Sequence, residues 1–563
     1  MRPQRILFRA MGEARHNNNR LVSFHPAKQV PQRRCTLKKK KTSHVPRAIA
    51  IGLIVSTMTG CATVSAPPGS PGGASQSENT LSSIFDSPNP CSNNDRNIGM
   101  VLGGVTGALV GGLTHGVEGA VVGAVVGVGG GFLVGHFLDA RRCELYKIAK
   151  AHDLKIASAR ITPDKLGVAP TGPAQKPSTA IGLDVQVENK GGEFTPGTAS
   201  ITPQAQAYLS QIARQYAPAV VEKHLPANAT PEQRLAAVNH KILIVGHTNL
   251  VDQAISGMSA AKLSQQRARA VATVFAENGV PAGNIYYQGA GDALPIAPVH
   301  TARGEKENNR VQIVDVPTIS DLQDYVQRRT VNASDFAPQP NVSAFTPVQA
   351  KAHPAVHHPV PAPVPVKAVH TVAHMGAGAG FGGTPLYGNG IPVDLGAAPA
   401  SHSMFGLISS AQADTPVIVP ACLSSHPHPV TAVRNLASGQ TLPPRDYVSG
   451  FYDAVWVAHA GKNLVAITHA NVLKGAGTYV PRPDVLIYKD YHGNTRQAPV
   501  FSGKVPVNVY RGQNKTLYRV FVNGPAKCID MVVPTGEYLG GSRLYYALNG
   551  KKYMSQPIFS LQH

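Results

Sequence analysis

The spacing of apolar residues between 241 and 316 predicts an α/β domain. Residues 241–245 form a β-branched apolar run that ends at a glycine, which is typical of a buried strand. Residues 259–278 carry apolar side chains three and four positions apart among Lys, Gln and Arg, so they predict an amphipathic helix. Two further strands are expected at 284–288 and 310–316. This order of elements predicts a sheet with helices packed against one face.

A different spacing, with a glycine at every fourth position, runs through residues 97–138. Its two arms contain Gly99, Gly103, Gly107 and Gly111, then Gly119, Gly123, Gly127, Gly131 and Gly135. Positions four apart share one helix face, so each arm presents a flat strip for close packing. Glycine lowers helix stability in water by about 1 kcal/mol per position. We therefore expect a helical hairpin at 97–140 that a membrane or an oligomer stabilises, the alternative being a soluble hairpin packed on its own chain.

Alternating apolar and polar residues return near the end of the chain and predict a small, mainly β domain, placed at 422–563. The expected strands and hairpin turns lie at 485–491, 492–494, 505–511, 516–522, 543–554 and 549–551. Residues 318–421 are rich in Pro, Gly and His and predict a semi-rigid linker with one extra helix at 319–331. A shorter connector is expected at 141–180, beginning with an amphipathic helix.

The basic charge of the chain is concentrated at its start. Residues 1–47 contain 13 Lys and Arg against Glu13, so they contribute +12 of the net charge of +21 and leave +9 for the rest. A nucleic-acid partner is therefore not expected, whereas the mildly basic remainder suits an anionic cell wall or lipid.

The basic segment leads into an export signal. Four lysines at 38–41 precede an apolar run at 48–58, and Met58-Thr59-Gly60-Cys61 reads as a lipobox, so residues 1–60 predict a signal peptide and Cys61 the lipidated first residue. The alternative is an uncleaved membrane anchor. No Asp follows Cys61, which favours the outer membrane, and residues 61–96 predict a flexible lipidated tether.

Four cysteines remain beyond the signal and lipidation sites. Because the periplasm oxidises thiols, an even number predicts two disulfides, although four cysteines allow three pairings. We expect the pairs Cys91–Cys143, which bracket the glycine-rich hairpin, and Cys422–Cys528, which bracket most of the last domain.

The α/β segment, from about 181 to 317, resembles the OmpA-like C-terminal domain of Gram-negative outer-membrane proteins and lipoproteins. The resemblance depends on motifs in one order: Gly246-His247-Thr248-Asn249, Leu263-Ser264, Arg267-Ala268, Val271, Gly279, Gly289, Gly291, Asp292, Pro295, Asn308, Arg310 and Val311. The glycine-rich arms likewise resemble the glycine-zipper domain of small bacterial lipoproteins and surface antigens.

The OmpA-like resemblance implies a site for the diaminopimelate of a peptidoglycan stem peptide. In that family an aspartate and an arginine hold its amine and carboxylate; the arginine position is Arg267, and a guanidinium suits a carboxylate through two parallel bonds. Asn249 stands at the aspartate position, and the loop that follows is about three residues longer than usual, so Asp252 is a candidate for that role. Asn308 and Arg310 complete the implied set.

These features predict a non-enzymatic outer-membrane lipoprotein that tethers the envelope by binding peptidoglycan. The alternative is a component of an envelope-spanning secretion or conjugation machine with a degenerate, weakly binding domain. The possible partners are peptidoglycan, the lipid membrane, secretion or envelope proteins, and a second copy of the chain joined through the glycine arms. No cofactor, metal or catalytic residue is expected; His459, His469 and Asp453 are a conceivable catalytic set, but no nucleophile accompanies them in a known setting. If Arg267 is closed into an ion pair that leaves no space for a ligand, this would argue against peptidoglycan binding.

Overall fold

The computed structural model describes residues 91, 130–166, 180–189, 192–329, 331, 333–336, 380–397, 416–445, 447, 451–473, 481–534 and 541–562. These residues all belong to one compact unit that extends from Glu78 to His563. The predicted signal peptide, the lipidation site at Cys61, most of the glycine-rich arms and most of the Pro/His-rich linker lie outside the described residues.

The α/β part is built on a mixed sheet with the order β1-β2-β5-β3-β4-β9. Only the β3–β4 pair is parallel within the described sheet, and the other neighbours run antiparallel. Its strands are β1 (Leu154–Ile161), β2 (Gly182–Asn189), β3 (Lys241–His247), β4 (Ile285–Gly291), β5 (Val311–Val316) and β9 (Arg434–Asn435).

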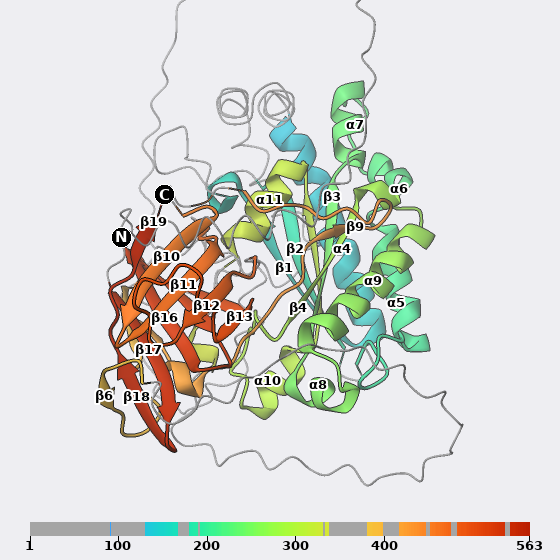
Figure 1. Ribbon diagram of the computed structural model, residues 1–563. Coiled ribbons are helices and arrows are strands. Elements are labelled where there is room, and N and C mark those ends of the chain that lie inside the picture. Colours follow the sequence, from blue (N-terminus) through green and yellow to red (C-terminus); the bar gives the residue numbers. More distant parts are fainter. Residues whose placement is uncertain are drawn as a thin grey trace, which may run out of the picture. The chain divides into compact units, whose positions relative to one another are not determined.

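Helices cover both faces of this sheet. Figure 1 shows α5 (Pro203–Arg214) and α9 (Ala260–Glu277) on one side and α11 (Ile319–Arg328) on the other. Along β3, Ile242 and Ile244 enter the core under α5 and α9, while the alternate residues enter the core under α11. The expectation of helices on one face is therefore incomplete, and this double burial explains why residues 242–245 of β3 are apolar without a break. Shorter helices are α6 (Pro218–Lys223), α7 (Pro231–Val238), α8 (Leu250–Ser256) and α10 (Ala302–Glu307).

The segment before this domain is part of it rather than a connector. Helix α4 (Gly130–His152) packs on the sheet through buried residues such as Phe137 and Leu145, and β1 adds an edge strand beside β2. The connector expected at 141–180 is thus wrong for 141–161. The amphipathic helix expected there is real, but its partner is the sheet.

A buried charge fixes α4. The Arg141 guanidinium pairs with the Asp315 carboxylate, donates to the Gln215 carbonyl oxygen at 3.1 Å and lies 4.2 Å from the Tyr216 ring centroid. His240 Nδ1 lies 2.6 Å from the other Asp315 oxygen. Burial alone would raise the pKa of Asp315, but Arg141 and His240 outweigh it and hold that pKa below its usual value.

The last part of the chain is β-rich, as expected, and consists of two antiparallel sheets that share one apolar core around Trp456. One sheet has the order β13-β12-β11-β10-β19 and the other β14-β15-β16-β17-β18-β6. Their bounds are β6 (Thr384–Pro385), β10 (Ala454–Ala460), β11 (Asn463–Ala470), β12 (Asp484–Tyr488), β13 (Phe501–Lys504), β14 (Val507–Arg511), β15 (Lys515–Phe521), β16 (Ala526–Pro534), β17 (Gly541–Leu548), β18 (Lys551–Ser555) and β19 (Ser560–Gln562). A separate pair joins β7 (Val393–Ala397) and β8 (Pro416–Val419).

Two chain segments depart from the predicted boundaries. Strands β6, β7 and β8 lie inside the stretch expected to be linker. Conversely, part of the expected β-rich domain pairs with the α/β sheet, because β9 adds to the edge of β4 and Thr431 exchanges backbone and side-chain hydrogen bonds with Gly289. This pairing covers a sheet edge that would otherwise expose unpaired backbone groups.

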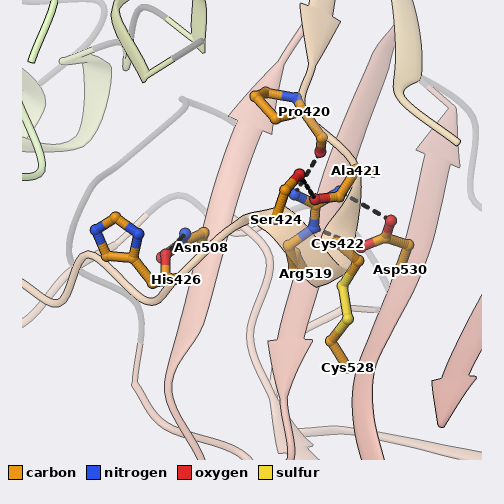
Figure 2. The surroundings of a disulfide bond; sticks show 9 residues. All are labelled: Pro420, Ala421, Cys422, Ser424, His426, Asn508, Arg519, Cys528 and Asp530. Atoms are coloured by element: carbon orange, nitrogen blue, oxygen red, sulfur yellow. Dashed lines mark hydrogen bonds and ion pairs between the residues drawn. A yellow bond between two sulfur atoms is a disulfide. The ribbon is translucent and has the colours of Figure 1, made fainter. Parts of the chain in front are cut away.

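The structure contains both disulfides expected from the sequence, Cys91–Cys143 and Cys422–Cys528. The second joins a short 3-10 turn (Cys422–Ser424) to β16. Figure 2 shows it beside a buried ion pair in which Arg519 Nε donates to Asp530 at 2.6 Å. The disulfide and the ion pair together hold the chain at 420–424 against the second sheet.

Removing the α4 anchor should destabilise the α/β domain. Arg141→Met leaves Asp315 buried with one partner fewer, and breaking a buried ion pair costs about 3–5 kcal/mol. Native-state hydrogen exchange should show faster exchange in α4 and β1, whereas Lys147→Met, at an exposed lysine of the same helix, should change little.

The same pair sets a pH dependence. A carboxyl whose folded pKa is depressed stabilises the fold above its unfolded pKa, near 4, and loses this contribution as the pH falls through the lower folded pKa. The stability difference between wild type and Arg141→Met should therefore shrink as the pH is lowered below about 4. A difference that stays constant down to pH 2 would contradict this assignment of the charge.

Candidate functional site

The candidate site lies where the turn at 194–198, helix α8 and helix α9 meet. Ser264 and Arg267 occupy the same face of α9, and Gly246 and Gly289 let β3 and β4 approach that helix closely. A Cβ at Gly246 would stand 2.2 Å from the Ser264 carbonyl oxygen, and one at Gly289 would stand 2.4 Å from the Ala261 carbonyl oxygen. The motif glycines therefore fix the helix on the sheet and place Arg267.

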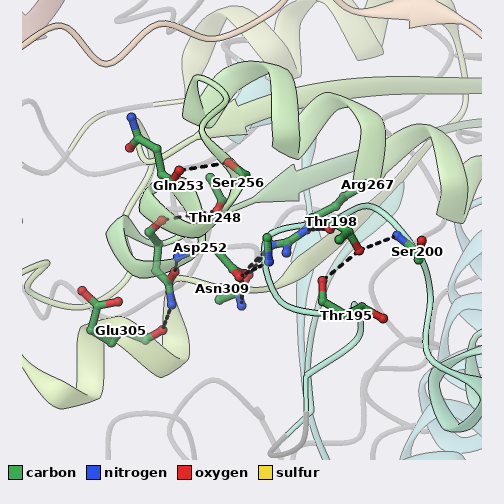
Figure 3. Close-up of polar contacts among 12 residues, drawn as sticks. Thr195, Thr198, Ser200, Thr248, Asp252, Gln253, Ser256, Arg267, Glu305 and Asn309 are labelled. Carbon is green, nitrogen blue, oxygen red and sulfur yellow. Dashed lines mark hydrogen bonds and ion pairs between the residues drawn. The ribbon is translucent and has the colours of Figure 1, made fainter. Parts of the chain in front are cut away.

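Arg267 is almost completely buried, with 1% of its side chain exposed. Its Nε donates to the Thr198 carbonyl oxygen at 2.8 Å, and its Nη1 donates to Asp252 at 2.7 Å and to Asn309 at 3.0 Å. The guanidinium also lies 4.8 Å from the Phe194 ring centroid. Figure 3 shows Thr198, Asp252 and Asn309 gathered around it, so the arginine is closed into an ion pair.

Asp252 is the residue that the sequence offers as a candidate for the role of the family's aspartate. One of its oxygens accepts from the Gly197 backbone N–H at 2.9 Å, and the other accepts from Arg267 and from the Asn309 amide at 2.9 Å. This carboxylate therefore accepts hydrogen bonds from three donors on separate segments of the chain. The longer loop is the reason that this residue reaches the arginine, since it forms α8 and places Asp252 in the first turn.

Asn249 has a structural task at the start of α8. Its Oδ1 accepts from the Asp252 backbone N–H at 2.8 Å as a helix cap, and its Nδ2 donates to the Glu305 carbonyl oxygen at 2.7 Å. It also lines a small cavity of about 10 Å³ with Thr248, Asp292 and Glu305, room for roughly one water molecule. The Glu305 carboxyl is half-buried; burial first, and the charge of Asp252 in addition, raise its pKa.

Neither Asn308 nor Arg310 bonds Arg267, although Asn308 lines the small cavity beside Asn249. The Asn308 side chain is buried and bonds the backbone of Ile296 and Ala297. Arg310 donates to Gln186 at 2.6 Å and to the Leu294 carbonyl oxygen at 3.0 Å, and burial lowers its pKa to about 10. Both hold the loop after β4.

Three contributors were not named in advance as site residues: Phe194, Thr198 and Asn309. Asn309 lies between the motif residues Asn308 and Arg310, and the resemblance assigned it no role. Its position next to Arg267 could be found only from the fold, because the two residues are 42 positions apart.

The histidines weighed for catalysis lie on the other domain and on its surface. His469 Nδ1 lies 3.1 Å from Asp484, and its Nε2 lies 4.0 Å from Asp453, with roughly half of the His469 and Asp453 side chains exposed. The His459 ring lies 6.1 Å from that of Tyr491. These are surface ion-pair and ring contacts.

The sheet, the motif glycines and the placement of Arg267 define an α/β domain of the OmpA class. Residues 193–310 match the OmpA family, and residues 98–142 match a glycine zipper. The chain therefore contains an OmpA family domain and a glycine-zipper domain, as the resemblances in its sequence predicted.

Two curated proteins share part of the chain. The outer-membrane lipoprotein YfiB of Pseudomonas aeruginosa is 42% identical over 81 residues, which are 14% of this chain and 46% of YfiB. The probable lipoprotein YiaD of Escherichia coli is 48% identical over 56 residues, 10% of this chain and 26% of YiaD. The chain thus spans less than half the length of either relative.

Solved structures similar to part of the chain include the periplasmic domain of Helicobacter pylori MotB, at 22% identity, with a TM-score of 0.20 over 25% of this chain and 80% of that one. The cell wall anchor of the T6SS from Pseudomonas aeruginosa gives 23% identity and a TM-score of 0.18 over 25% of this chain and 86% of that one. Scores this low carry no functional argument. Among the residues that the structure describes, no helix combines the length and apolar character needed to cross a membrane.

The cap at Asn249 gives a stability prediction. Asn249→Ala removes the bond to the Asp252 N–H and the bond to Glu305, and loss of a helix cap costs about 1–2 kcal/mol. Asn249→Asp keeps the capping oxygen and should cost less, although it cannot donate to Glu305. Thermal unfolding followed by circular dichroism would measure both, and equal losses would show that the cap contributes nothing.

Proposed function

We propose that the chain is a non-enzymatic outer-membrane lipoprotein that binds the diaminopimelate stem peptide of peptidoglycan through its OmpA family domain. The observation that carries this proposal is the pairing of Arg267 with Asp252 at 2.7 Å, because the family's arginine keeps a carboxylate partner although the family's aspartate is Asn249 here. The lipobox at 58–61 and the two relatives named as lipoproteins support the lipid anchor. The glycine zipper would pack within the membrane or between copies.

A ligand carboxylate has one route to Arg267 in this arrangement. Asn309 is only half-buried, and it offers the guanidinium a neutral oxygen. A charged carboxylate in its place would form a stronger hydrogen bond. Within the described chain, Arg267 Nη2 has no protein hydrogen bond, so it could supply the second bond of a bidentate pair.

The amine of the ligand needs an acidic partner, and two carboxyl groups are close. Asp252 lies at the arginine, and Glu305 lines the small cavity beside Asn249. Within the described residues, Glu305 Oε2 is buried without a hydrogen-bond partner. An ammonium group at this point would satisfy that oxygen and favour the charged form of Glu305.

A second function fits one observation better. Arg267 is closed into its ion pair, and the small cavity beside Asn249 holds about one water, which suits a scaffold whose wall binding is weak. In that case the modules would serve assembly in an envelope-spanning apparatus. The two proposals differ in whether the free domain binds the wall.

Sedimentation with purified sacculi separates them. The chain from residue 62 onward should sediment with diaminopimelate-type sacculi, and Asp252→Asn or Arg267→Lys should weaken binding by at least about tenfold, since each removes a charge-assisted contact worth roughly 1.5–3 kcal/mol. Arg269→Ala, at an exposed arginine of the same helix, should bind like wild type.

Each variant should first show wild-type thermal unfolding, because Arg267 is buried and its replacement can disturb the fold. Wild-type protein that stays in the supernatant would reject wall binding and leave the scaffold function. Equal loss in Arg269→Ala would show that charge alone, rather than this site, holds the wall.

A further inference from the structure

Outside the Arg267 cluster, three side chains converge where the α/β domain meets the segment after the second disulfide. They are Asp292, which directly follows β4, and His426 and His428. One ligand atom from each residue lies within 4.8 Å of the other two. His428 and Asp292 are 136 positions apart, so this cluster arises only in the folded chain.

The distances suit a small metal ion. His428 Nδ1 lies 3.0 Å and His426 Nε2 lies 3.6 Å from the same Asp292 oxygen. Ligands about 2.0–2.1 Å from a tetrahedral zinc ion lie roughly 3.3–3.4 Å from one another. The two observed distances to Asp292 bracket that value, and the ligand nitrogens of the two histidines lie within 4.8 Å of each other.

The local sequence holds both imidazoles in place. His426-Pro427-His428-Pro429 puts a proline after each histidine, which keeps both histidines extended. In an extended chain, positions two apart face the same side, so both rings point to one place. Their centroids lie 4.2 Å apart.

The neighbouring β-rich domain fixes this strip of chain further. Asn508, on β14, accepts from the His428 backbone N–H at 2.8 Å and donates to the His426 carbonyl oxygen at 2.9 Å. Figure 2 shows the bond from Asn508 to His426, close to the Cys422–Cys528 disulfide. The Phe336 ring lies 4.1 Å from that of His428. Metal sites gain affinity from such supporting contacts.

Burial and access are also those of a binding site. The Asp292 and His428 side chains are 10% and 6% exposed, whereas His426 is 54% exposed and leaves a path for an ion. A buried carboxylate that shares one oxygen between two histidines is a nitrogen-and-oxygen donor set, which suits zinc and its first-row neighbours.

We propose that Asp292, His426 and His428 bind a divalent transition ion of the zinc type, with water completing its coordination. The ion would bridge the loop after β4 to the segment that follows Cys422–Cys528. It would therefore fasten the β-rich domain to the OmpA family domain. This site is separate from a group of five histidines in the Pro/His-rich linker, which are His353, His357, His358, His370 and His374.

The test uses the whole mature chain, stripped of metal by a chelator and titrated with Zn²⁺ and with Co²⁺, whose visible spectrum reports tetrahedral coordination. Wild type should bind one equivalent with tetrahedral Co²⁺ bands. His426→Gln should weaken this binding by at least about 100-fold. Because His426 is half-exposed, this substitution should leave the fold intact.

Two controls guard against binding elsewhere. His492→Gln, at an exposed histidine of the β-rich domain, and a linker variant in which the five histidines between residues 353 and 374 are changed to Gln should keep the tight site. Hydrogen exchange at 426–431 should slow when Zn²⁺ is added to wild type and stay unchanged in His426→Gln. Loss of binding in the linker variant alone would overturn the proposal, as would absence of tight binding in wild type, which would leave an aspartate–histidine hydrogen-bonded cluster only.

Discussion

The burial of the Arg267 guanidinium is the constraint on which the candidate site depends. A charge with 1% of its side chain exposed must be paired and hydrogen-bonded, or the fold would lose several kcal/mol. The Thr198 carbonyl, the Asp252 carboxylate and the Asn309 amide supply these bonds from three separate segments. The turn at 194–198, helix α8 and the loop before β5 are therefore ordered around one side chain.

The same pairing limits how a ligand can enter. Asp252 is tied to the arginine and to the Gly197 N–H, while Asn309 contributes neutral contacts and is only half-buried. Under the proposed function, a ligand would therefore replace Asn309 rather than Asp252 beside the guanidinium. Its affinity would then depend on how easily Asn309 moves, and a low affinity would correspond to the scaffold function.

Local sequence patterns predicted the central elements well. The β3 run, the α9 spacing and the helix after β5 are local signals, and the hairpin turn at Asn549-Gly550 follows from two residues that tolerate positive φ, at 49° and 74°. The two disulfides were predicted from the even number of cysteines and from the segments that each pair brackets. Asp252, named as a candidate because of the longer loop, lies 2.7 Å from Arg267 in the structure.

Features that depend on distant partners could not be predicted in this way. The sequence predicted an amphipathic helix at Arg141 but not its partner, because Asp315, which pairs with the buried guanidinium, is 174 positions away. The addition of β9 to the sheet edge and the His426–His428 cluster likewise arise from contacts between remote segments. The contact between Asn309 and Arg267 could not be predicted for the same reason, because it depends on the fold and not on the residue type.

The most direct measurement follows the Arg267 side-chain Nε–H resonance by NMR during titration with a soluble diaminopimelate-containing muropeptide. A lysine-containing muropeptide, which lacks the second carboxylate, serves as the matched ligand. The account predicts a saturable shift of the Arg267 signal with the first ligand and none with the second. If neither ligand shifts this signal in a sample whose thermal unfolding shows that it is folded, the claim that this guanidinium holds a cell-wall carboxylate would be contradicted.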